Sequence, residues 1–82
     1  MDKGELYIII KNLSAGFLDE KIDGSLYSKI VESLISLNLN IVDVELEEFS
    51  EFLAQYKSKP DIPELHGDNE LKKEIKKIFN LK

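Results

Sequence analysis

Few side chains in this chain of 82 residues are candidates for catalysis. The one imidazole is His66, in a segment that also holds Pro60, Pro63 and Gly67, and no cysteine is present as a thiol nucleophile or metal ligand. A metal site needs several donors brought together, and one histidine beside irregularly spaced carboxylates does not meet that requirement. The four glycines stand apart, so no phosphate-binding loop is predicted. We therefore expect no enzyme, metal or cofactor. A minimal hydrolase would require His66 to lie in a cleft beside carboxylates.

Acidic side chains form the pattern that points to binding. Positions 30–56 hold six carboxylates and no lysine. On a helix over Asp43–Tyr56, Glu47 and Glu51 point away from the apolar stripe, and Glu48 lies on their flank. This face is either a solvated helix surface or a binding surface for a positively charged partner, which such a charge concentration attracts.

Further candidates follow this helix. Asp61, Glu64 and Asp68 add negative charge in the next loop, and Tyr56 is either an aromatic anchor for a partner or the end of the core stripe. The candidate partner-binding residues are Glu47, Glu48, Glu51, Tyr56, Asp61, Glu64 and Asp68. All eleven basic residues are lysine and the net charge is −5, so direct nucleic-acid binding is not expected.

The elements that position these residues are predicted to be helices. Asp2 with Glu5 three residues later forms a capping box, and an apolar repeat at helical spacing follows at Leu6, Ile10, Leu13 and Phe17. The run Tyr7–Ile10 is rich in β-branched residues and also suits a short buried strand.

Three more helices are predicted after this one. A turn over Asp19–Gly24 precedes a helix capped by Asp23 or Ser25, whose apolar residues up to Leu37 span about 180° of arc, which indicates packing on two sides. The third helix covers Asp43–Tyr56. The last helix, capped by Asp68 or Asn69, buries a stripe at Leu71, Ile75, Ile78 and Phe79.

The fold class predicted from these elements is all-α, a single domain over residues 1–82 arranged as an antiparallel four-helix bundle. The alternative is a small α+β fold of βαβα order, with strands at Leu6–Ile10 and Ile41–Val44. The apolar run Leu6–Ile10 is too short for a signal peptide or a membrane span, so we expect a cytoplasmic protein without membrane contact.

Several short motifs resemble the colicin D immunity protein family. Phe17-Leu18-x-x-Lys21-Ile22 with a following aromatic at Tyr27 is similar to the turn between two helices in that family. Asp68-Asn69-x-Leu71-Lys72 resembles the start of its final helix, and Pro60-Asp61 falls in the comparable loop. The resemblance extends, in short pieces such as these, over about two-thirds of the chain.

The resemblance implies a small helical immunity protein that binds the catalytic domain of a nuclease toxin, covering a basic cleft that would otherwise hold tRNA. Asp61 is the acidic position that the resemblance carries over. Tyr56 and Lys57 stand where a neighbouring acidic contact is expected, so the chain departs from the family there.

Two functional hypotheses follow. The first is a non-enzymatic immunity protein whose basic partner is the nuclease domain of a bacteriocin or contact-delivered toxin. Charge reversal at Glu47, Glu51 and Asp61 is expected to weaken that binding without unfolding the protein. The second is a protein-interaction module, such as a phage-encoded inhibitor or a small subunit of an assembly, that binds through apolar residues such as Ile8 and Val44.

Overall fold

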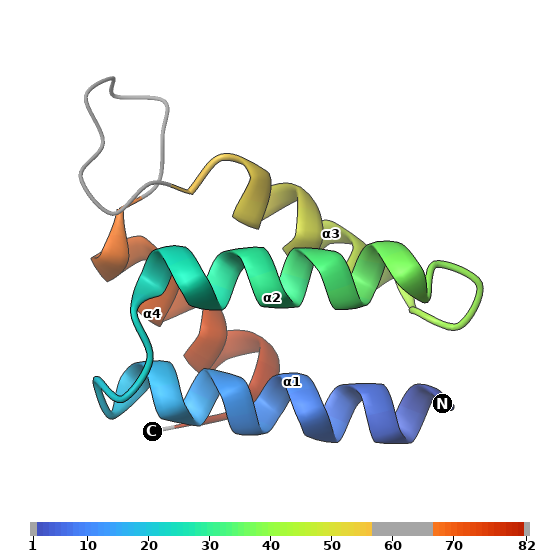
Figure 1. Ribbon diagram of the computed structural model, residues 1–82, viewed down its shortest axis with the longest axis horizontal. Helices are drawn as coiled ribbons and strands as arrows, with labels where there is room; N and C mark the ends of the chain where they lie inside the picture. The colour runs from blue at the N-terminus through green and yellow to red at the C-terminus, as the bar shows by residue number, and fades with distance from the viewer. Residues whose placement is uncertain (1, 57–66, 82) are drawn as a thin grey trace.

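The computed structural model describes residues 2–56 and 67–81, which form four helices and, within those residues, no strand (Figure 1). The helices are α1 (Lys3–Leu18), α2 (Gly24–Leu37), α3 (Val44–Ala54) and α4 (Asp68–Phe79). The prediction of an all-helical protein is confirmed at this level.

The alternative with strands at Leu6–Ile10 and Ile41–Val44 is wrong. Leu6 and Ile10 are fully buried within α1, whereas Ile8 between them is 58% exposed. A strand that buried Leu6 and Ile10 would bury Ile8 as well, because its side chains alternate between two faces. Residues 41–43 belong to the connection before α3 and not to a strand, and Val44 is already the first residue of the helix.

Aspartates begin three of the helices, as the sequence predicts. Asp2 and Glu5 form the capping box of α1, with the Glu5 N–H donating to Asp2 Oδ1 over 2.8 Å. Asp23 accepts from the Leu26 N–H, and Asp43 accepts from the Leu46 N–H at 2.9 Å. Each contact satisfies a backbone N–H that has no partner within its own helix.

The start of α4 differs from the prediction. Gly67 is the N-cap and Asp68 is already helical, so neither Asp68 nor Asn69 caps this helix. The Gly67 N–H donates to the carboxylate of Glu70 at 3.1 Å, so a side chain within the helix accepts the hydrogen bond of the N-cap N–H. The side chain of Asp68 is engaged elsewhere, with Tyr56.

The end of α3 also differs, because the helix stops at Ala54 and does not continue to Tyr56. The N–H groups of Gln55 and Tyr56 bond to carbonyls three residues back, at 3.1 Å each, so the last turn tightens before the chain leaves the helix. Tyr56 therefore lies just beyond the end of the helix, where its half-buried side chain still packs against the core.

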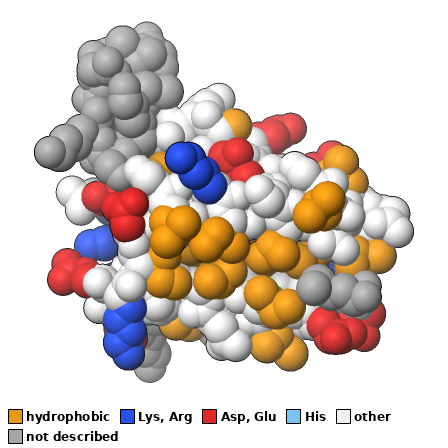
Figure 2. Space-filling view, viewed as in Figure 1, with side chains coloured by type: hydrophobic (Ala, Val, Ile, Leu, Met, Phe, Trp, Pro, Cys, Tyr) orange, Lys and Arg blue, Asp and Glu red, His pale blue; other side chains and the backbone are white. Residues whose placement is uncertain are grey.

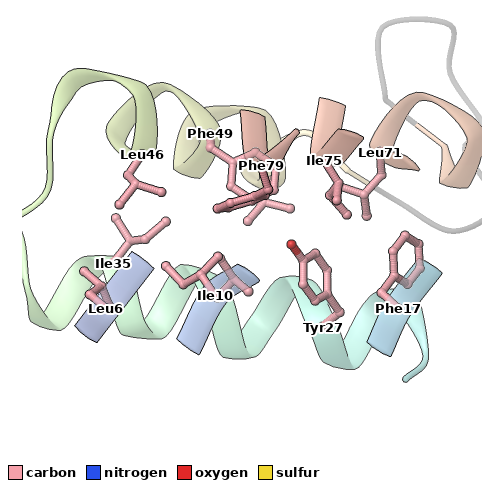
Figure 3. Close-up of a cluster of buried hydrophobic side chains, with 12 residues drawn as sticks. Leu6, Ile10, Phe17, Tyr27, Ile35, Leu46, Phe49, Leu71, Ile75 and Phe79 are labelled. Atoms are coloured by element: carbon pink, nitrogen blue, oxygen red, sulfur yellow. The ribbon is translucent and has the colours of Figure 1, made fainter. Parts of the chain in front are cut away.

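The four helices share one buried core. Its fully buried members come from every helix and include Leu6 and Ile10 on α1, Ile35 on α2, and Ile75 on α4 (Figure 3). Aromatic rings fill the centre: Phe17 stacks on Tyr27 at 5.2 Å, and Phe49, Phe79 and Tyr7 form tilted or edge-on pairs. Such pairs add about 0.5–1.5 kcal/mol each beyond the burial of their area.

The buried hydroxyl of Tyr27 has a hydrogen-bond partner in Ser14. Ser14 Oγ lies 2.7 Å from the Ile10 carbonyl and 2.5 Å from the Tyr27 hydroxyl. Since a serine has one proton, and the Ile10 carbonyl can only accept, Tyr27 is the donor to Ser14. Burial raises the pKa of Tyr27, so the phenol remains a donor at neutral pH.

Helices α1 and α2 lie side by side (Figure 1), and the buried side chains separate this pair from α3 and α4 (Figure 3). Helix α2 also packs against α3. α4 packs against α1. Among the described residues, no helix has the length and hydropathy needed to cross a membrane.

Candidate partner-binding surface

The acidic residues at the start of α3 have a structural explanation. Asp43 caps the helix and forms an ion pair with Lys3 at 3.2 Å, and Glu45 and Glu47 lie in the first turn. Negative charge there interacts favourably with the free N–H groups of the helix start. The Leu46 N–H and then Lys3 hold the pKa of Asp43 below its ordinary value.

Glu48 and Glu51 have no such explanation. Both are exposed, both lie beyond the first turn, and neither forms an ion pair within the described part of the chain. Glu51 is four residues after Glu47 and three after Glu48, spacings at which like charges destabilise a helix by about 0.2–0.5 kcal/mol per pair. Helix α3 contains no lysine. These two glutamates therefore reduce the stability of the helix that carries them.

Helix α4 in the same protein has the opposite pattern. Its acidic residues Asp68 and Glu70 are in the first turn, and Lys76 and Lys77 are in the last turn. Glu70 and Glu74 are each followed by a lysine three residues later. Helix α4 also has like-charge pairs, since Glu70 stands four residues before Glu74, but each of these glutamates has a lysine within reach to offset the repulsion. The comparison identifies α3 as the helix whose charges all have one sign, with no lysine in the helix to offset them.

A groove runs between α3 and α4 on the acidic side. It has a volume of about 450 Å³ and is lined by Val44, Glu45, Glu48, Glu74, Lys77 and Ile78. Val44 is 68% exposed, and Ile78 is half-buried. The groove thus offers two aliphatic side chains bordered by three glutamates and one lysine. This combination suits a segment that has both an apolar and a basic side chain.

Tyr56 and Asp68, which the sequence placed in the binding surface, contact each other. The hydroxyl of Tyr56 donates to Asp68 Oδ1, joining the end of α3 to the first residue of α4. Both side chains are half-buried. This contact gives the pair a structural role, and their role in binding a partner stays a prediction.

Gly24 makes room for this contact. A Cβ atom at Gly24 would overlap the Tyr56 hydroxyl and would lie 3.0 Å from Asp68 Oδ1. Gly24 is buried at the first position of α2. The Tyr56 hydroxyl therefore occupies the space where three helix ends meet, and a glycine is required there because of close approach.

The structure places the remaining candidates as follows. Glu47, Glu48 and Glu51 are exposed along α3. Asp61, Glu64 and His66 lie outside the described residues. Within the described chain, no group of three or more histidine, cysteine or acidic side chains is placed to hold a metal ion.

Sequence reasoning missed the α4 side of the groove. Glu74 was explained by its pair with Lys77, and Ile78 was assigned to the core stripe of the last helix. Only the packing of α3 beside α4 brings these residues next to Val44 and Glu48. The one signal in the sequence was Val44, an aliphatic residue on the acidic face of its helix.

Comparisons with known proteins give no further identification. A scan against protein-family models and searches of curated proteins and of solved structures found no match to this chain.

Proposed function

We propose that this protein is a non-enzymatic inhibitor, an immunity protein that binds the basic nuclease domain of a toxin and blocks its active site. In this proposal, the carboxylates of α3 occupy the cleft in place of the phosphates of the RNA substrate. The nuclease is proposed to be a tRNase of a bacteriocin or contact-delivered toxin, following the resemblance to the colicin D immunity protein family. Inhibition would take place in the cytoplasm, where that RNA is found.

The observation that carries the proposal is the pair Glu48 and Glu51. Their charges oppose helix stability and α3 has no lysine to offset them, whereas Glu70 and Glu74 of α4 are each followed by a lysine three residues later. Residues that reduce stability without a structural benefit are expected at functional sites. A surface of one sign also speeds the encounter with an oppositely charged partner.

The groove beside these glutamates supplies the apolar part of the interface. Val44 is too exposed to contribute much to the core, and it borders Glu48 in the groove. Affinity in protein complexes usually comes from a few desolvated contacts surrounded by polar ones. We assign Val44 and Ile78 to that central role and Glu45, Glu48 and Glu51 to the charged border. An antiparallel order of the four helices is part of the proposal.

Neutralising substitutions separate this function from stability. The variant Glu48→Gln/Glu51→Gln is expected to unfold at an equal or higher urea concentration, because each change removes like-charge contacts worth about 0.2–0.5 kcal/mol. The same variant is expected to bind at least about tenfold more weakly, a loss of about 1.4 kcal/mol. The probe is the C-terminal domain of the protein encoded immediately upstream, and binding is measured by calorimetry.

The matched control is Asp19→Asn/Glu20→Gln. These two acidic residues are also exposed, but they lie in the turn between α1 and α2, so the control changes the net charge equally at another place. Equal loss of affinity in both variants would mean that only the total charge matters. Unchanged affinity in Glu48→Gln/Glu51→Gln would refute the site.

A second candidate function is an interaction module that binds through apolar surface. The exposed fractions of Ile8 (58%) and Val44 (68%) favour it. Salt distinguishes the two candidates, since an electrostatically steered complex weakens as ionic strength rises and an apolar one does not. Affinity that is constant from low to high salt would support the second candidate.

A further inference from the structure

The groove between α3 and α4 has one cation among its lining side chains, Lys77. The α3 wall of the groove consists of Val44, Glu45 and Glu48, and the α4 wall consists of Glu74, Lys77 and Ile78. Lys77 is exposed, and within the described part of the chain it forms no ion pair, either along α4 or across the groove. The two walls therefore differ in charge, because the α3 wall is wholly acidic and the α4 wall has one carboxylate and one ammonium group.

The position of Lys77 in α4 accounts for a lysine in this turn, but not for a lysine that faces the groove. Lys76 and Lys77 both lie in the last turn of α4, where a cation interacts favourably with the free carbonyl groups of the helix end. Successive residues of a helix point in different directions, and Lys76 does not line the groove. Lys76 therefore supplies the same interaction with the helix end from outside the groove, whereas Lys77 also adds a positive charge to the groove.

This positive charge makes the groove selective among basic partners. A segment with basic side chains alone would be attracted by Glu45 and Glu48 and repelled by Lys77. A segment that also has a carboxylate would avoid this repulsion, because its carboxylate could pair with Lys77. Interfaces that discriminate between partners combine attractive contacts with a repulsive contact that penalises the wrong partner. Lys77 has the sign and the position of such a contact.

We propose that Lys77 determines which basic segments the groove accepts. The occupant is a segment of the nuclease domain in which an aliphatic side chain stands between a basic and an acidic side chain. The aliphatic side chain packs on Val44 and Ile78. The basic side chain pairs with Glu45 and Glu48, and the acidic side chain pairs with Lys77. This inference rests on the proposed inhibitor function and adds the charge pattern of the segment that the groove binds.

The apolar face over α1 and α2 is separate from this groove. Apolar side chains gather over these two helices (Figure 2), and among them Leu26 is 54% exposed and Leu37 is 80% exposed. The buried core separates α1 and α2 from α3 and α4 (Figure 3). A charge at the groove is largely screened at that face in physiological salt, where the Debye length is about 8 Å. A partner bound over α1 and α2 would therefore not respond to the charge of Lys77.

The variant Lys77→Gln tests the proposal with two probes. The first probe is the C-terminal domain of the protein encoded immediately upstream, and the second is a hexalysine peptide, which has basic side chains alone. We expect Lys77→Gln to bind the upstream domain about two- to fivefold more weakly, and hexalysine about two- to fivefold more tightly, the range for one exposed ion pair. Calorimetry measures both affinities. A merely structural role of Lys77 would not change the two affinities in opposite directions.

The matched control is Lys76→Gln, which removes the same charge from the same turn of α4 and leaves the groove unaltered. Urea unfolding is expected to be the same for the two variants, because both lose one cation at the helix end. Lys76→Gln is expected to bind the upstream domain and hexalysine as the unmodified chain does.

The outcomes separate this inference from the proposed function. An upstream domain that does not bind the unmodified chain would refute the proposed function and this inference with it. If the domain binds, the role of Lys77 alone would be refuted by any of three results. These are unchanged or tighter binding of the domain by Lys77→Gln, no increase in the affinity for hexalysine, or equal effects of Lys76→Gln.

Discussion

Replacing Gly24 by alanine tests the contact that joins the ends of three helices. The added Cβ would overlap the Tyr56 hydroxyl and would approach Asp68 Oδ1 and Tyr56 Cζ to 3.0 Å. Because the start of α2 is buried, the Tyr56 ring is the group that must move, and not the α2 backbone. The hydrogen bond from Tyr56 to Asp68 would then be lost.

The magnitude follows from this bond. A hydrogen bond to a charged group contributes about 1.5–3 kcal/mol, and the partial exposure of this pair favours the lower value. Alanine in place of glycine favours a helix by up to about 1 kcal/mol, which offsets part of the loss. We expect Gly24→Ala to lower the free energy of unfolding by about 1 kcal/mol, or the melting temperature by about 4–8 °C.

The assay is urea unfolding followed by circular dichroism, with Gly4→Ala as the control. Gly4 lies in the first turn of α1, and a Cβ there meets only Asp2 Oδ1 at an ordinary 3.4 Å. The control is therefore expected to be neutral or stabilising. In a Tyr56→Phe background, Gly24→Ala is expected to cost less than in the unmodified protein, because no hydroxyl is displaced. Equal effects of Gly24→Ala and Gly4→Ala would refute the reasoning.

Two further predictions concern the interior and the acidic cap. Ser14→Ala is expected to lower the free energy of unfolding by about 1–3 kcal/mol, because it leaves the buried Tyr27 donor without its acceptor. In a Tyr27→Phe background the same change is expected to be near neutral. Urea unfolding of the four proteins tests this, and equal costs in both backgrounds would contradict it. Asp43→Asn keeps a capping side chain but removes a carboxylate whose folded pKa is below the ordinary 3.8. Stability from such a group is present above pH 3.8 and is lost as pH falls through the folded pKa, so unfolding measured at pH 7 and pH 3 is expected to differ less in the variant.

Local sequence signals predicted the helices and most of their starts. Asp2, Asp23 and Asp43 act as caps in the structure because capping depends on residues only three positions apart. The same local reasoning failed at the start of α4. There the Gly67 N–H donates to Glu70, and Asp68 accepts a hydrogen bond from Tyr56 instead of capping the helix. That pairing spans twelve residues and belongs to tertiary structure.

The candidate site was predictable in part for the same reason. Glu48 and Glu51 are visible as an outward face once α3 is recognised, since helical periodicity fixes their direction. The groove with Glu74 and Ile78 depends on how α3 packs beside α4, which no single-helix pattern contains. The sequence showed that the apolar stripe of α2 is broad. Which side of that stripe the other helices leave exposed became evident only from the packing of the four helices.

The most direct test of the inhibitor function is growth rescue in a sensitive host. The C-terminal domain of the protein encoded immediately upstream is expressed alone, with this chain, or with Glu48→Lys/Glu51→Lys, whose folding is checked by circular dichroism. The account predicts toxicity that is relieved by the unmodified chain and not by the reversed variant. A harmless upstream domain, toxicity that the chain does not relieve, or equal rescue by the reversed variant would contradict it.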